Sequence, residues 1–249
     1  MIHILPVPGI GEIASGDDLG ALLGRALAPL APETGDILVV TQKIVSKAEG
    51  QRVALSTVTP GARAIEIAGA IGKDPRLVEL VLAESTQVVR AAPKVLITRH
   101  RLGLVMANAG IDASNIGTAQ PDSVLLLPKD PDASAAGLRD AIQARLGVKL
   151  GIVLSDSFGR PWRNGVVNVA IGSAGLPAIH DKRGGLDRDG RPLQVTQIAY
   201  GDLLASAAGL AMGEAAEGLP VVLVRGCLLP DEDIPAARLV RPLGEDLFQ

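Results

Sequence analysis

The chain contains very few aromatic residues and a single cysteine. Aromatics make up 2% of the 249 residues, and Cys227 is the only thiol. One cysteine cannot form an internal disulfide, which predicts a protein of a reducing compartment such as the cytoplasm. Four aromatic rings cannot supply the stacking platform that single-stranded nucleic acids need. The core must therefore be built from small and aliphatic side chains.

An excess of positive charge and a long hydrophobic run are also missing. The chain carries 24 basic and 27 acidic residues, for a formal net charge of −3, so it lacks the basic footprint of a nucleic-acid partner. No apolar run approaches the roughly 20 residues of a membrane span. The first residues, 1–6, lack the basic and apolar regions of a signal peptide. From these absences we expect that the protein binds neither nucleic acids nor membranes.

The common catalytic signatures are absent as well. The sequence has no Walker A loop, no dinucleotide-binding glycine fingerprint, no zincin helix motif and no nucleophile elbow. It has three histidines, His3, His100 and His180, which with one cysteine argue against a transition-metal site. The functional residues must be sought in other patterns.

What is present is an apolar fraction of 47%, divided into short runs by glycine and proline. These runs predict strands at 2–5, 36–42, 87–90, 95–99, 104–107, 123–127, 149–154, 165–171 and 221–225. Helical spacing predicts helices at 18–30, 62–71, 75–84, 133–146 and 202–216, with N-caps at Asp17, Asp74 and Asp132. Because strands and helices do not alternate regularly, we expect an α+β fold with a mixed sheet and flanking helices. We expect one domain over 1–249, with a candidate subdomain boundary near 128–131.

Four segments carry polar residues where an apolar strand ends. They are 7–12, rich in Pro and Gly; 42–50, with two lysines; 106–115, with Asp112 and Asn115; and 154–165. Glycine lets backbone N–H groups approach a phosphate, and lysine meets phosphate as a point charge. An ordinary turn, a solvated loop and a capping aspartate are the alternative interpretations of the first three segments.

The segment 154–165 is the most informative. It places Asp156 and Ser157 at the end of an apolar strand, followed by Arg160 and Arg163 in a Gly/Pro loop. Mg²⁺ and Mn²⁺ prefer carboxylate and hydroxyl oxygens, and arginine binds phosphate or carboxylate in bidentate fashion. Together with lysine these groups are typical of phosphoryl transfer. Phe158 and Trp162 predict that aromatic rings brace this loop. The alternative is a capping acid, a core ring and surface charge.

Residues 44–50, 108–115 and 155–163, followed in order by 169–172, 202–208, 212–214 and 220–226, resemble the coenzyme F420-0:L-glutamate ligases, the gamma-glutamyl ligases of deazaflavin biosynthesis. The resemblance spans nearly the whole chain. It implies a GTP-dependent enzyme that adds L-glutamate to coenzyme F420-0 through an acyl phosphate, and then further gamma-linked glutamates. It also implies an α+β fold in an intertwined homodimer with two divalent ions, Mg²⁺ or Mn²⁺, and K⁺ as a further candidate ion.

The resemblance carries over to individual positions. Asp112 and Asp156 match ligands of a first metal, and Ser157 and Glu214 match ligands of a second. The positions implied for GTP binding are Val7, Pro8, Gly9, Ile10, Gln42, Lys43, Lys47, Asn115, Met212, Gly213, Glu214, Ala215, Ala216, Glu217, Gly218 and Leu219. Gln42 and Lys43 stand where archaeal members tend to carry small hydroxyl residues. We assign Asp112, Asp156, Arg160 and Arg163 to catalysis, with both arginines as clamps for substrate phosphate or carboxylate.

Two other functions fit the same residues. One is a metal-dependent GTP phosphohydrolase that uses the same oxygen ligands without an amino acid acceptor. The other is a nucleotide-binding module without turnover. The joint presence of Asp112, Asp156, Ser157 and Lys47 favours an enzyme over a module, because a binding protein has no need of every charged group.

Overall fold

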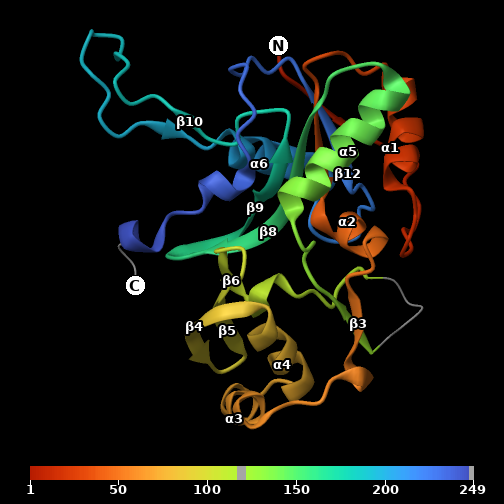
Figure 1. The fold of residues 1–249 in the computed structure, drawn as a ribbon, viewed down its shortest axis with the longest axis vertical. Coiled ribbons are helices and arrows are strands. Elements are labelled where there is room, and N and C mark those ends of the chain that lie inside the picture. Colours follow the sequence, from red (N-terminus) through yellow and green to blue (C-terminus); the bar gives the residue numbers. More distant parts are fainter. Residues whose placement is uncertain (117–121, 247–249) are drawn as a thin grey trace.

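Five strands form a mixed sheet in the upper half of the molecule (Figure 1). A computed structural model describes residues 1–116 and 122–246. The strand order is β1 (His3–Pro6), β12 (Val221–Arg225), β2 (Ile37–Thr41), β8 (Gly151–Arg160) and β9 (Arg163–Ala174). Only β2 and β8 run parallel, and the other neighbours are antiparallel. The expected α+β fold with a mixed sheet is confirmed.

Helices cover both faces of this sheet. On one face α1 (Leu19–Leu27) and α5 (Pro131–Leu146) pack on alternate strand residues such as Leu38 and Val40. On the other face α6 (Tyr200–Met212) packs on Ile37 and Val39. Residues that alternate along a strand point to opposite faces, so two covered faces require the continuous aliphatic run seen in β2. Small side chains in α6 let it lie close to the sheet, which is how the chain builds a core with few rings.

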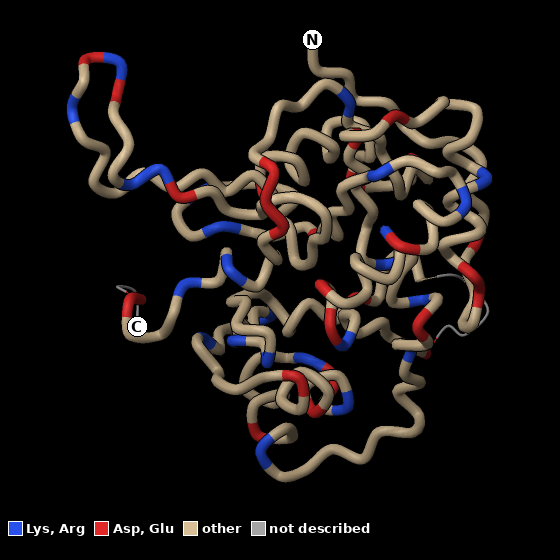
Figure 2. Tube along the Cα trace, turned by 45° about the horizontal axis from the view of Figure 1, so that its top comes forward, with Lys and Arg blue, Asp and Glu red and all other residues tan. Residues whose placement is uncertain are grey.

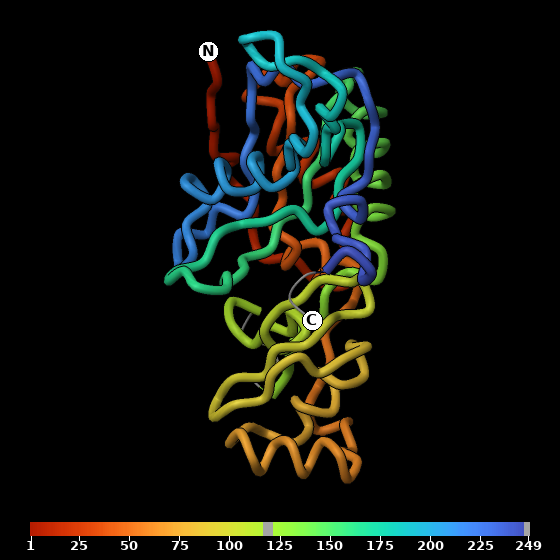
Figure 3. Tube along the Cα trace, turned by 90° about the vertical axis from the view of Figure 1, so that its left-hand side faces the viewer, coloured from red at the N-terminus to blue at the C-terminus, as the bar shows by residue number. Residues whose placement is uncertain are grey.

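Residues 52–116 and 122–125 form a small lobe below the sheet (Figures 1 and 3). It contains helices α3 (Ala62–Ile71) and α4 (Pro75–Ala83), a meander of β4 (Ser85–Ala92), β5 (Val95–His100) and β6 (Val105–Ala107), and the pair β3 (Arg52–Ala54) and β7 (Ser123–Leu125). Its own apolar cluster holds these elements together. The remaining described residues form the sheet lobe. Whether residues 128–131 mark a subdomain boundary stays a prediction.

The structure corrects several expectations about local elements. The segment after β2 is a helix, α2 (Gln42–Ala48), where the sequence suggested a loop. The N-caps of α1 and α5 are Asp18 and Asp130, whereas Asp74 caps α4 as expected. Asp132 lies inside α5 and accepts hydrogen bonds from the backbone of Ser173, Ala236 and Ala237. Its carboxylate therefore ties the helix to a distant segment.

The expected loop at 156–163 is instead a long hairpin. Strands β8 and β9 pair as far as Arg160 and Arg163, and the turn between them is only Pro161 and Trp162. Phe158 packs against the core, but Trp162 sits at the tip with 84% of its surface exposed. The expectation that Trp162 braces the site is wrong, because inter-strand hydrogen bonds supply that rigidity. Figure 3 shows the hairpin reaching out between the two lobes.

A second hairpin projects from the sheet lobe. It spans residues 181–197 between the short strands β10 (His180–Asp181) and β11 (Gln197–Ile198), and it carries basic and acidic residues side by side (Figure 2). Its tip is a tight turn at 187–190, closed by a hydrogen bond from Gly190 N to Asp187 O at 3.1 Å. Within the described residues, no helix combines the length and apolarity needed to cross a membrane.

Candidate active site

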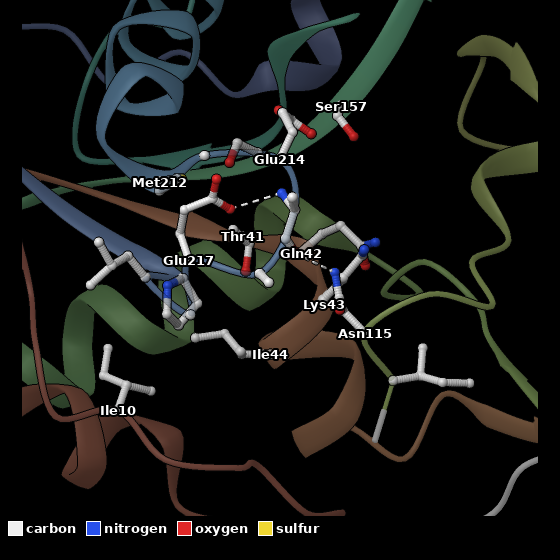
Figure 4. A pocket seen from close by; sticks show the side chains of 18 of the residues that line it. Ile10, Thr41, Gln42, Lys43, Ile44, Asn115, Ser157, Met212, Glu214 and Glu217 are labelled. Carbon is white, nitrogen blue, oxygen red and sulfur yellow. Dashed lines mark hydrogen bonds between the residues drawn. The ribbon is translucent and has the colours of Figure 1, made fainter. Parts of the chain in front are cut away.

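A cavity of about 700 Å³ opens where β2 ends next to α2, beside the middle of β8. Its lining comes mainly from five regions: the turn after β1, helix α2, the middle of β8, and the two loops at 113–116 and 213–220. The carboxyl ends of parallel strands are a common place for ligands, because the chain leaves the sheet there in different directions. Cavities of this volume accept small-molecule ligands. Figure 4 shows the lining side chains.

Helix α2 places two lysines on the cavity. Lys43 and Lys47 are four residues apart and therefore lie on one face of the helix. Lys47 is only 7% exposed, and its Nζ lies 3.0 Å from Oε2 of Glu12. Next to them, Gln42 Oε1 accepts a hydrogen bond from Ser46 Oγ at 2.9 Å. Among the described residues, Gln42 Nε2 has no partner at normal hydrogen-bond geometry, so the amide is positioned but partly unsatisfied.

Strand β8 brings Asp156 and Ser157 to the cavity. One extra residue in β9, Ile171, bulges between the pairs Leu154–Gly172 and Ser155–Ala170. A bulge of this kind rotates the following side chains, here those from Ser155 onward. Burial raises the pKa of the Asp156 carboxyl to about 7, and the nearby charge of Asp112 adds to this. The Ser157 backbone, Lys43 and the Gln42 amide oppose the increase. A carboxyl of this kind gains from a cation placed beside it.

Asp112 reaches the same region from the small lobe. The three residues Asn108, Ala109 and Gly110 all have positive φ, between 52° and 68°, and this left-handed turn precedes the bridge that pairs Asp112 with Leu125. Asp112 Oδ2 lies 2.7 Å from Lys43 Nζ, and Oδ1 accepts from Ser114 N and Oγ, each at 2.8 Å. Burial alone would raise the pKa of Asp112, but the hydrogen bonds from Lys43 and Ser114 outweigh it and hold the pKa below its usual range.

The loop after α6 closes another side of the cavity. The helix ends at Met212, and Gly213 with φ of 71° turns the chain. Glu217 accepts a hydrogen bond from Ala215 N at 2.8 Å, and the Asn115 amide donates to Ala215 O at 3.0 Å. The second bond joins the two lobes across the cavity. In Figure 4, Glu214 and Ser157 lie on the same side of the cavity.

The structure brings most of the candidate residues together. Those that line the cavity are Ile10, Gln42, Lys43, Lys47, Asn115, Asp156, Ser157, Met212, Gly213, Glu214, Ala215, Ala216, Glu217, Gly218 and Leu219. Asp112 joins them through its ion pair with Lys43. Val7 is buried in the core, and Pro8 and Gly9 are exposed outside the lining.

Arg160 and Arg163 do not line this cavity. They occupy the far end of the β8–β9 hairpin, where Arg160 donates to Asn164 O at 3.4 Å. Their role as substrate clamps stays a prediction. Conversely, the lining includes Thr41 and Asn168, to which the sequence assigned no role. Asn168 could have been found only through its pairing opposite Ser157, which sequence periodicity does not reveal.

The donor set suits a hard divalent cation. It offers the carboxylates of Asp112 and Asp156 and the hydroxyl of Ser157, which are the oxygen ligands that Mg²⁺ and Mn²⁺ prefer. Within the ranges that the structure describes, no three His, Cys, Asp or Glu side chains stand close enough together to hold an ion. Lys43 is paired with Asp112, and its charge also acts on Asp156.

Comparison with known proteins identifies the family of the chain. The family model described as F420-0:Gamma-glutamyl ligase matches residues 9–226. The chain is 44% identical to the coenzyme F420:L-glutamate ligase of Methanopyrus kandleri, over 100% of this chain and 98% of that protein. It is 43% identical to the protein of the same name from Methanothermobacter thermautotrophicus, over 100% and 99% of the two chains. It is 46% identical to the one from Halobacterium salinarum, over 93% and 90%. The chain therefore belongs to the F420-0:gamma-glutamyl ligase family.

Proposed function

We infer that the chain is a coenzyme F420:L-glutamate ligase that joins L-glutamate to coenzyme F420-0 in the biosynthesis of coenzyme F420. Family membership over the full length supports this activity. The observation that supports the chemistry is the meeting of two lysines and two aspartates at one cavity. These are the groups that a transferred phosphoryl group and its cations require.

The reaction must first activate a carboxylate. A carboxylate is a poor acceptor for an amine, because it has no good leaving group at neutral pH. In the proposed first step an oxygen of the terminal carboxylate of F420-0 attacks the γ-phosphorus of GTP, which forms an acyl phosphate and releases GDP. The amine of L-glutamate then attacks the acyl carbon, an amide bond forms, and inorganic phosphate leaves with the bonding electron pair. The same cycle on the new glutamate adds further gamma-linked residues.

The residues divide between nucleotide and cation binding. Lys47, the least exposed cation of the cavity, would bind the phosphates once Glu12 moves away. Asn115, Gln42, the loop at 213–219 and the turn at 7–10 would hold GTP. Asp112 and Asp156 would bind a first divalent ion, and Ser157 and Glu214 a second, either Mg²⁺ or Mn²⁺, with K⁺ as a further candidate. When bound, these cations neutralise the phosphate charge.

A homodimer also belongs to this proposal. The β8–β9 hairpin carries Arg160 and Arg163 away from its own cavity, and two apolar side chains of the hairpin, Trp162 and Val166, are exposed. A second copy that packs on this hairpin would cover those side chains and bring the arginines towards substrate. Light scattering on the purified protein measures the subunit number.

The test is an assay with GTP, Mn²⁺, L-glutamate and F420-0, read by mass spectrometry and by GDP release. The expected result is a product heavier by one glutamyl residue, with GDP released over many turnovers only when F420-0 and L-glutamate are both present. Multiple-turnover GDP formation in the absence of both would instead identify a GTP phosphohydrolase. GTP binding without turnover would identify a binding module. Arg160→Ala and Arg163→Ala in the same assay should raise the KM for an acceptor, and an unchanged KM for both acceptors would exclude the clamp role.

Replacing either proposed metal ligand tests the residue assignment. Asp112→Asn and Asp156→Asn should each lower kcat at least about 1,000-fold, because each removes a charged ligand from the place where phosphoryl charge develops. Circular dichroism should show an intact fold. Activity near that of the wild type at low Mn²⁺ in either variant would contradict the two-metal assignment.

A further inference from the structure

Both oxygens of the carboxylate proposed as a cation ligand in the small lobe already have partners. Lys43 Nζ lies 2.7 Å from Oδ2 of Asp112, and both hydrogen bonds from Ser114 go to Oδ1. The Lys43 and Asp112 side chains are 26% and 25% exposed, so the pair is partly shielded from water. A cation that binds Oδ2 of Asp112 would therefore stand next to the ammonium group of Lys43 and compete with it for this oxygen.

The charges around this pair decide when that exchange is favourable. Lys43 also lies close enough to Asp156 to lower the pKa of that carboxyl, so a single ammonium interacts with both aspartates. A divalent ion entering alone would meet this positive charge at short range, which opposes its binding. A triphosphate entering with the ion supplies negative charge that attracts both. Lys43 lines the nucleotide cavity, and its flexible four-carbon stem lets the ammonium move from carboxylate to phosphate.

From this geometry we infer that Lys43 is a positioning residue that couples cation binding to nucleotide binding. It holds Asp112 in place while the cavity is empty, and it moves to the phosphates when cation and nucleotide arrive together. The inference rests on the proposed function, because it takes Asp112 as a cation ligand. Since coupling between two ligands is reciprocal, the ammonium group that weakens binding of the cation alone also makes nucleotide binding depend on the cation.

Removal of the positive charge of Lys43 should allow the cation to bind without the nucleotide. In Lys43→Ser, the affinity for Mn²⁺ alone should rise at least tenfold, and the ratio of Mn²⁺ affinities with and without GTP should shrink by a similar factor. Lys43→Arg keeps the charge and should bind Mn²⁺ alone as weakly as the wild type. Lys149→Ser is the matched control, because Lys149 is exposed at the other end of the sheet, before β8.

The measurement is electron paramagnetic resonance of free Mn²⁺ during titration of the full chain, with and without GTP and with no acceptor present. A titration of GTP without protein corrects for metal held by the nucleotide itself. The inference is overturned if Lys43→Ser binds Mn²⁺ alone as weakly as the wild type. It is also overturned if Lys43→Arg or Lys149→Ser gains the same affinity as Lys43→Ser.

The two levels of the proposal fail in different ways. If the wild type binds no Mn²⁺ even with GTP, or if Asp112→Asn binds it equally well, the proposed metal site is wrong and the role of Lys43 is lost with it. If GTP promotes Mn²⁺ binding that Asp112→Asn abolishes, but Lys43→Ser leaves the affinity for Mn²⁺ alone unchanged, the proposed function stands and only the coupling role fails.

Discussion

The two walls of the cavity are supported in different ways. The sheet-lobe wall, formed by β2, α2 and β8, lies against two apolar clusters that cover both faces of the sheet. The small-lobe wall, residues 108–115, is irregular and begins with the left-handed turn at 108–110. It is secured by burial of Ala109 and Ile111 in the apolar cluster of the small lobe and by a contact from Lys73 Nζ to Asn108 Oδ1. Across the cavity the walls are joined by the Lys43–Asp112 ion pair and by the hydrogen bond from Asn115 to Ala215.

Each wall holds its acid at a cost, and the two costs differ in kind. The sheet lobe keeps Asp156 where burial disfavours its charge, which is an electrostatic cost. The small lobe keeps non-glycine residues in the left-handed region, which is a conformational cost of about 1–3 kcal/mol per residue. The well-packed sheet can tolerate the buried carboxyl of Asp156. The loop at 108–115 instead presents Asp112 next to Lys43, and movement of Lys43 would leave this carboxylate free to bind a cation.

The largest change in the free energy of unfolding is expected from removing the buried charge of Asp156. Asp156→Asn should stabilise the empty protein by roughly 2–4 kcal/mol above pH 7. The folded-state pKa of Asp156 is about 7, above the usual value of 3.8 for an aspartate. Well below pH 3.8 the carboxyl is neutral in both states and costs nothing. As the pH rises to 7 only the unfolded state ionises, so the wild type loses stability that the asparagine variant keeps.

Urea unfolding of both proteins at pH 4, 6 and 8 checks this expectation. Asp189→Asn is the control, because Asp189 is exposed in the hairpin at 181–197. A difference between Asp156→Asn and the wild type that stays the same at all three pH values would show that burial of charge is not the cost carried by this wall.

A smaller effect is expected from straining the other wall. Gly110 has φ of 68°, and a Cβ there would lie 2.7 Å from Met106 Cε and 2.9 Å from Leu127 Cδ1. Gly110→Ala should therefore cost about 1–3 kcal/mol of stability. Asp112 follows two residues later, so the substitution should also displace this proposed metal ligand. If the displacement raises the activation free energy by roughly 1.4 kcal/mol, kcat should fall about tenfold.

Gly137→Ala is the matched control for Gly110→Ala. Gly137 lies in α5 with nothing within 4 Å of an added Cβ, so alanine should stabilise the helix by about 0.5–1 kcal/mol. Urea unfolding and GDP release measure both variants. If Gly110→Ala proved as stable and active as Gly137→Ala, the turn would not be the strained support that the comparison assigns to it.

The sequence predicted the sheet-lobe wall better than the small-lobe wall. Aliphatic runs such as 37–41 and 221–225 identify buried strands directly, and Asp156 follows one of them. Helix α2 was missed because Gln42–Ala48 is short and follows the strand without a linker, so its spacing is hidden. The small-lobe turn was recognised only by its residue types, since three successive left-handed residues have no periodicity.

Ion pairs between distant segments were also beyond the sequence. Lys43 and Asp112 are 69 positions apart, and Glu12 and Lys47 are 35 apart. The first pair depends on how the two lobes pack, and the second on how the turn after β1 meets α2. No local pattern in the sequence records either arrangement. The sequence identified these residues as chemically suitable, and the fold determined which of them are paired while the cavity is empty.

The smallest effect is expected at the Glu12–Lys47 ion pair. It lies within the sheet lobe, and it must open before Lys47 can bind phosphate. Glu12 is 72% exposed and holds the nearly buried Lys47 at 3.0 Å. Glu12→Gln keeps the shape but removes the charge that competes with phosphate. Because exposed ion pairs contribute about 0.2–1 kcal/mol, GTP affinity should rise only about 1.4- to fivefold. Calorimetric titration of GTP in the presence of Mg²⁺ measures the change, with Glu66→Gln, an exposed residue of α3, as the control. A lower affinity in Glu12→Gln would mean that Glu12 contacts the nucleotide. The Lys43–Asp112 pair would then be the ion pair that opens for the nucleotide, and the Glu12–Lys47 pair would not.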